Sequence, residues 1–118
     1  MNLDFKAIVC EVLEIEGGAL MDSRTKIDGA EWGKIVDLIM SANRLIVLGV
    51  GKSGHIGAKI AATLSSTGTP SLFIHPTEAM HGDLGAITQD DAVLAISYSG
   101  ESEELINLMP HLRRLSRG

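Results

Sequence analysis

The stretch that decides the fold is a glycine-rich turn, Gly49-Val50-Gly51-Lys52-Ser53-Gly54-His55-Ile56-Gly57. The apolar run 45–48 leads into it, and the helix-compatible run 58–64 follows it. A strand, a glycine-rich turn and a helix in this order bring free backbone N–H groups and a helix N-terminus to one point, which attracts phosphate. Lys52 adds a positive charge, and Ser53 adds a hydroxyl that can cap the helix or bind a phosphate oxygen. The stretch therefore predicts a phosphate site.

Strand and helix patterns alternate along the rest of the chain, which predicts an α/β fold with a parallel sheet between two helical layers. The predicted strands are 44–50, 71–75 and 91–97, and the predicted helices are 5–20, 28–41, 53–66, the single turn 76–80, and a last helix that begins near 102. Parallel sheets bind ligands at the carboxyl ends of their strands. Three strands leave long exposed edges, so we expect the first part of a larger fold or a chain that completes itself by oligomerising.

The N-terminal helices carry three further expectations. Gly17-Gly18 lies inside the first helical pattern, but the apolar phase continues through it, which favours one weakened helix over two. An amphipathic helix that packs on a partner subunit also fits this pattern. Cys10 falls in the apolar stripe, so we expect a buried, inert thiol. In the second helix we expect a buried stripe formed by Trp32, Ile35, Val36 and Ile39. In the last helix we expect one buried face, formed by Leu105, Met109 and Leu112, with a kink at Pro110.

Composition excludes several classes of protein. The 118 residues carry a formal charge of -5, which argues against a nucleic-acid partner. No apolar run approaches the about 18 residues of a membrane span, and no signal peptide is recognisable, so we expect a cytoplasmic protein. The single cysteine forms neither an intrachain disulfide nor a zinc cluster, and no spacing of ligands is diagnostic of a metal.

Three phosphate-binding motifs compete for the first turn. A nucleotide P-loop requires a glycine five residues before Gly51, where this chain has Ile46. A dinucleotide site is matched by the glycine spacing, but the second strand then needs an acidic residue at its end and has His75 instead. The third candidate is a sugar-phosphate site.

A second polar turn supports the sugar-phosphate site. Ser97, Ser99 and Ser102 surround Gly100 where the last helix begins, and together they offer three hydroxyls, several N–H groups and a favourable dipole. A plain serine N-cap with solvated neighbours is the alternative. An equivalent turn at the adjacent strand end favours one phosphate site built from both turns.

Four stretches together resemble the sugar isomerase (SIS) domain, and more narrowly the bacterial arabinose-5-phosphate isomerase family. They are the glycine-rich turn, Ala-Ala-Thr-Leu-Ser-Ser-Thr-Gly-Thr-Pro at 61–70, His-Pro-Thr-Glu-Ala-Met-His-Gly-Asp-Leu-Gly at 75–85, and Ser-Tyr-Ser-Gly-Glu-Ser at 97–102. The resemblance implies a flavodoxin-like αβα fold, with residues 1–42 as N-terminal helices and residues 43–118 as the first part of the core. The family's later strands, with a further acidic residue and histidine of the active site, and its CBS domains are absent from this sequence. Tyr98 stands where the family often has a small amide residue, which alters one wall of the pocket.

The resemblance also implies an activity. The family interconverts D-arabinose 5-phosphate and D-ribulose 5-phosphate through a cis-enediol, without metal or cofactor, in the synthesis of Kdo for lipopolysaccharide or capsule. Its members are usually tetramers. The alternative is a non-catalytic SIS module that senses a sugar phosphate.

The expected roles follow from the matched motifs. Phosphate is bound by the turn Gly51–Ser53 and by the second turn at Ser97, Ser99, Gly100 and Ser102. Lys52 faces the sugar oxygens as the electrophile, Glu104 is the candidate base, and His81 contacts a sugar hydroxyl or shuttles a proton. His55 either reaches the pocket or packs in the core or an interface. Glu101 and Glu103 fit the helix dipole alone, and His75 and His111 are interpreted as structural.

Overall fold

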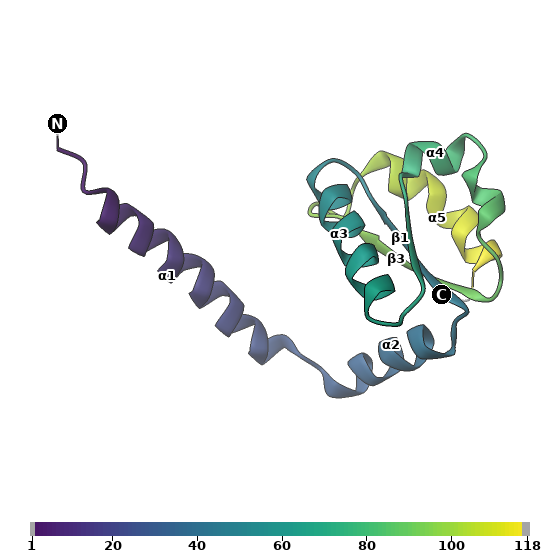
Figure 1. The fold of residues 1–118 in the computed structure, drawn as a ribbon, viewed down its shortest axis with the longest axis horizontal. Helices are drawn as coiled ribbons and strands as arrows, with labels where there is room; N and C mark the ends of the chain where they lie inside the picture. The colour runs from purple at the N-terminus through teal and green to yellow at the C-terminus, as the bar shows by residue number, and fades with distance from the viewer. Residues whose placement is uncertain (1, 117–118) are drawn as a thin grey trace. The chain divides into compact units, whose positions relative to one another are not determined.

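A computed structural model describes residues 2–116 of the chain (Figure 1). The elements are α1 Phe5–Ser23, the 3-10 helix η1 Arg24–Lys26, α2 Gly29–Ser41, β1 Arg44–Gly49, α3 Lys52–Ser66, β2 Ser71–Ile74, α4 Pro76–Met80, the 3-10 helix η2 Asp83–Ala86, β3 Asp91–Ile96 and α5 Glu103–Leu115. The chain divides into two compact units, 1–34 and 35–118, which are described separately below. No helix within residues 2–116 is both long enough and apolar enough to cross a membrane.

The first unit contains α1, which continues as one helix through Gly17 and Gly18, as the apolar phase predicts. Asp4 caps it, because its Oδ1 accepts a hydrogen bond from the N–H of Ala7 at 3.1 Å. None of its residues is buried. The expectation that Cys10 is buried is therefore wrong: the thiol is free and exposed, like the other residues of α1.

Helix α2 begins at a cap formed by Asp28, whose Oδ1 accepts from the N–H of Ala30 at 2.8 Å and of Glu31 at 3.3 Å. Its C-terminal residues Leu38 and Ile39 pack against the core of the second unit. The predicted buried stripe is wrong for the remaining positions: Trp32, Ile35 and Val36 are all exposed.

The second unit is a three-layer αβα sandwich around a parallel sheet with the strand order β2-β1-β3. Central strand β1 is buried on both faces. Ile46 and Leu48 join the core cluster that includes α4 and α5, whereas Leu45 and Val47 join the cluster that includes α3. Figure 1 shows α3 on one side of the sheet and α5 on the other. The predicted α/β architecture is confirmed.

Helix α5 differs in detail from its predicted buried face. Leu105 and Leu112 are buried as expected, but Leu108 is the third buried residue and Met109 is 38% exposed. The helix continues through Pro110 to Leu115. Buried residues on both sides of the proline retain the helix, although Pro110 cannot donate to the carbonyl four residues earlier.

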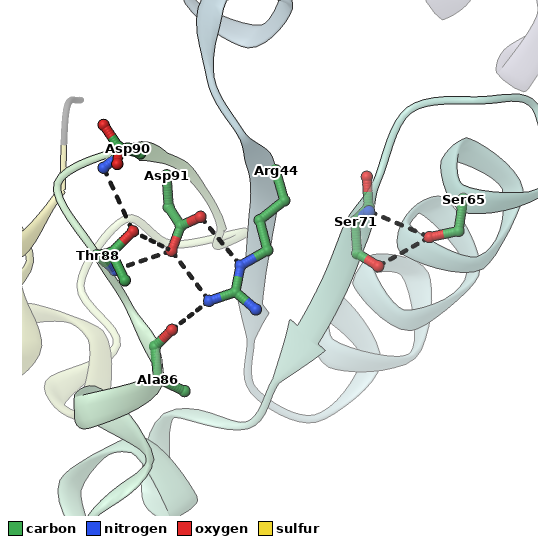
Figure 2. Close-up of polar contacts among 7 residues, drawn as sticks. All are labelled: Arg44, Ser65, Ser71, Ala86, Thr88, Asp90 and Asp91. Carbon is green, nitrogen blue, oxygen red and sulfur yellow. Dashed lines mark hydrogen bonds and ion pairs between the residues drawn. The ribbon is translucent and has the colours of Figure 1, made fainter.

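An ion pair between the half-buried Arg44 and the fully buried Asp91 connects the amino ends of β1 and β3 (Figure 2). Nε of Arg44 donates to Oδ1 of Asp91 at 3.0 Å, and Nη2 of Arg44 donates to Oδ2 at 3.1 Å and to the carbonyl of Ala86. The N–H and hydroxyl of Thr88 also donate to Oδ2, at 2.8 and 3.3 Å. Burial raises the pKa of Asp91, but the hydrogen bonds from Arg44 and Thr88 outweigh it, so the net pKa is lowered. The carboxylate therefore stays ionised although its side chain is fully buried.

Candidate functional site

The glycine-rich turn has the geometry of an anion site. Gly51 is the N-cap of α3 and has a φ of 59°, which glycine adopts without strain. The first N–H groups to bond back along the chain are those of Gly54, to Val50 at 3.4 Å, and His55, to Gly51 at 3.1 Å. The N–H groups of Lys52 and Ser53 precede them, have no partner within the helix, and lie at the positive end of its dipole. The Lys52 side chain is exposed beside them.

Two glycines of the same stretch have a packing role. A Cβ added to Gly54 would lie 2.7 Å from the carbonyl oxygen of Gly49, and one added to Gly49 would lie 2.8 Å from the backbone of Ser53. Helix α3 therefore approaches the end of β1 too closely for any side chain at either position. Two of the three glycines that match the dinucleotide-binding motif, Gly49 and Gly54, are therefore required by this packing, whether or not a ligand binds there.

The serine turn forms its own network of hydrogen bonds. The N–H of Gly100 donates to Oγ of Ser97 at 2.9 Å, and the N–H of Glu101 donates to Oγ of Ser99 at 3.0 Å. The hydroxyls of Ser97 and Ser102 are 3.1 Å apart and share one further hydrogen bond. Each serine that accepts an N–H keeps its own hydroxyl proton for another acceptor. The turn is thus ordered, and at least two of its hydroxyl protons remain to be donated.

The sheet brings these two turns together. Gly49, the last residue of β1, is paired with Ile96, the last residue of neighbouring β3. Both strands are parallel, so the two turns begin side by side at the carboxyl edge of the sheet, and each runs into the N-terminus of a helix. Two positive helix ends at one edge suit a dianionic group such as a phosphate.

Two of the histidines share a hollow, and His81 does not line it. His55 and His75 line a hollow of about 200 Å³ with Gly51, Gly54, Ala58 and Phe73, beside the glycine-rich turn and the end of β2. His81 ends α4 as its C-cap and is exposed. The sequence analysis interprets His75 as structural. The signal in the sequence for a capping role is Pro76, which directly follows His75 and is typical of the first position of a helix.

The acidic residues lie at the start of α5. Glu103 and Glu104 are in its first turn and exposed, and Glu101 lies just before it. All three suit the helix dipole, so position alone does not single out Glu104. Their negative charges lie beside the serine turn, and the exposed Lys52 at the start of α3 is a cation that can offset the charge of an incoming phosphosugar.

Comparisons with known proteins agree with this geometry. The family described as SIS domain matches residues 38–117. Arabinose 5-phosphate isomerase KdsD of Pseudomonas aeruginosa is 49% identical over 115 residues, and the match covers 97% of this chain and 35% of that protein. Arabinose 5-phosphate isomerase KpsF of Escherichia coli is 47% identical over 106 residues, covering 89% of this chain and 33% of the relative.

A solved structure agrees as well. The E. coli CFT073 protein c3406, in complex with arabinose 5-phosphate, superposes with a TM-score of 0.79 at 35% identity, covering 98% of this chain and 67% of that one. The chain thus spans about a third of the length of the curated relatives it matches.

Proposed function

This chain belongs to the SIS domain family. On that basis we propose that it is an aldose–ketose isomerase that interconverts D-arabinose 5-phosphate and D-ribulose 5-phosphate. The observation that carries the proposal is the pairing of Gly49 with Ile96, which starts two anion-binding turns side by side. The proposed substrate is the one for which the two relatives, both arabinose 5-phosphate isomerases, are named. Within the family fold, residues 1–42 are proposed as N-terminal helices and 43–118 as the first part of the core.

The phosphate is proposed to lie between the two turns. Ser99 donates its hydroxyl proton, because its oxygen is already used as an acceptor. The pair Ser97 and Ser102 donates one more, and the N–H groups at the starts of α3 and α5 complete the site. Gly51 and Gly100 have positive φ angles of 59° and 70°, which glycine adopts without strain, and so they allow the backbone of each turn to take this conformation.

The chemistry requires one proton to move between two carbons. Glu104 is proposed to take the proton from C2 of the open-chain aldose while the C1 carbonyl becomes an enediolate oxygen, which the ammonium of Lys52 stabilises. The carbon proton is then returned to C1. His81 is proposed to carry the proton between the two oxygens, and His55 to contact the sugar from the other side of the glycine-rich turn. No metal or cofactor takes part in this scheme.

The proposal extends to assembly and pathway. The apolar side chains exposed on α1 and α2, among them Phe5, Leu13 and Trp32, are the surface that further copies would cover in a homotetramer. We further propose that the reaction belongs to Kdo synthesis and takes place in the cytoplasm, as the family resemblance implies.

Lys52 provides the test of this function. We expect Lys52→Ala to lower kcat/KM for arabinose 5-phosphate by about 100-fold, because one charge on the developing oxyanion is lost. The assay follows ribulose 5-phosphate formed by this chain and by a longer chain of family length. Lys59→Ala is the matched control, since Lys59 is an exposed lysine on the same helix outside the turn.

Two results would count against the enzyme. An unchanged rate in Lys52→Ala removes the lysine from the mechanism. Binding of the sugar phosphate without turnover, by this chain and by the longer one, would instead favour the non-catalytic sensor module.

A further inference from the structure

Helix α4 is a five-residue segment held between two histidines. His75 is its N-cap: Nδ1 of the imidazole accepts from the N–H of Thr77 at 3.1 Å, and the His75 carbonyl accepts from Ala79 at 3.0 Å. His81 is its C-cap, and its N–H donates to the carbonyls of Thr77 and Glu78 at 3.2 and 3.1 Å. The same residue, Thr77, therefore bonds to both histidines.

A helix this short does not form on its own, because nucleation is unfavourable and few hydrogen bonds repay it. The buried residues Pro76 and Ala79 anchor one side of it in the core. Its start depends on the imidazole of His75, which takes the place of the usual Ser, Thr, Asp or Asn. To accept at Nδ1, the neutral ring must carry its proton on Nε2.

We propose that His75 is a positioning residue that sets the place of His81 through α4. The cap fixes the first turn, and the first turn supplies the carbonyls that hold the His81 backbone. His75 also lines the hollow beside Gly51 and His55, so it faces the same space as the glycine-rich turn. The inference rests on the proposed function only in assigning His81 to the sugar.

The first test needs no activity. Imidazole nitrogen NMR of the chain should show an unprotonated, hydrogen-bonded Nδ1 and a protonated Nε2 for His75. Amide exchange at Ala79 and His81 should accelerate about fivefold in His75→Phe, which corresponds to the about 1 kcal/mol of a lost N-cap. His75→Asn should stay near the unsubstituted chain, because its Oδ1 can accept from Thr77. His111→Phe, a histidine on α5, is the matched control.

The second test is kinetic. In the protein that turns over arabinose 5-phosphate, His75→Phe should lower kcat by about tenfold with KM little changed, and His75→Asn should restore most of kcat. Equal exchange and equal kcat in all variants would overturn the inference, as would His75→Asn behaving like His75→Phe. If no protein with this sequence isomerises the sugar, the proposed function fails, and the exchange experiment still decides the cap.

Discussion

Replacing Gly54 by alanine should lower the free energy of unfolding by about 3 kcal/mol, at the upper end of the effects of overpacking. The new Cβ would lie 2.7 Å from the carbonyl oxygen of Gly49 and 3.2 Å from its carbon. Both atoms belong to the backbone where β1 ends, so neither moves without displacing the strand or α3. The loss should exceed the about 1 kcal/mol that alanine gains over glycine inside a helix.

Two glycines serve as matched controls. Gly57→Ala meets only side-chain atoms, with Cγ1 of Val47 at 3.1 Å and the ring of Phe73 at 3.3 Å, so small rotations accommodate it. Gly33→Ala in α2 meets nothing within 4 Å and should stabilise the helix by about 1 kcal/mol. Urea unfolding followed by far-UV circular dichroism measures all three, since the single tryptophan, Trp32, is exposed and lies outside the unit that contains Gly54 and Gly57. Equal stability of Gly54→Ala and Gly57→Ala would contradict the packing argument.

Removing Arg44 from the buried ion pair should have a comparable effect. Arg44→Met leaves the fully buried carboxylate of Asp91 with Thr88 as its remaining donor and should destabilise the chain by about 3 kcal/mol at pH 7. The figure lies at the low end for broken buried pairs, because the Arg44 side chain is 31% exposed and solvent screens part of its charge. Asp91→Asn should cost less, since it leaves no buried charge.

The free energy of unfolding should depend on pH in different ways with and without Arg44. The pKa of Asp91 is lowered on folding, so its ionisation stabilises the chain above the unfolded pKa of about 3.9, and that stability is lost as the pH falls through the folded value. Without Arg44, burial should dominate and raise the pKa, so the carboxyl of Arg44→Met should take up a proton on folding. The stability gap between the two proteins should therefore begin to narrow as the pH falls through the raised pKa of the variant, and it should narrow further below about pH 3.9, where the lowered pKa of Asp91 is approached. A gap that stays constant from pH 7 to pH 3 would contradict this account.

Local patterns predicted the elements that carry the site. The apolar run before Gly49, the glycine spacing and the serines around Gly100 each act over a few residues, so β1, both turns and the starts of α3 and α5 could be read from the chain. The α/β architecture followed from their order. The assignment of roles to Lys52, His81 and Glu104 stays a prediction, because it comes from the family resemblance.

Long-range contacts could not be predicted in the same way. The Arg44–Asp91 pair depends on the register of two strands 47 residues apart, and nothing in the local sequence gives that register. The exposure of Cys10 and Trp32 was missed because periodicity identifies an apolar face without saying which molecule covers it. The capping role of His75 was missed because histidine is an uncommon N-cap.

The central claim is that the two turns form one phosphate site, and calorimetric titration of arabinose 5-phosphate into the chain tests it most directly. Ser99→Ala should weaken binding by about tenfold or more, the effect of one hydrogen bond to a charged group. Ser66→Ala, an exposed serine at the other end of α3, should leave the Kd unchanged. Binding that Ser99→Ala leaves untouched, or no binding by the unsubstituted chain, would contradict the account.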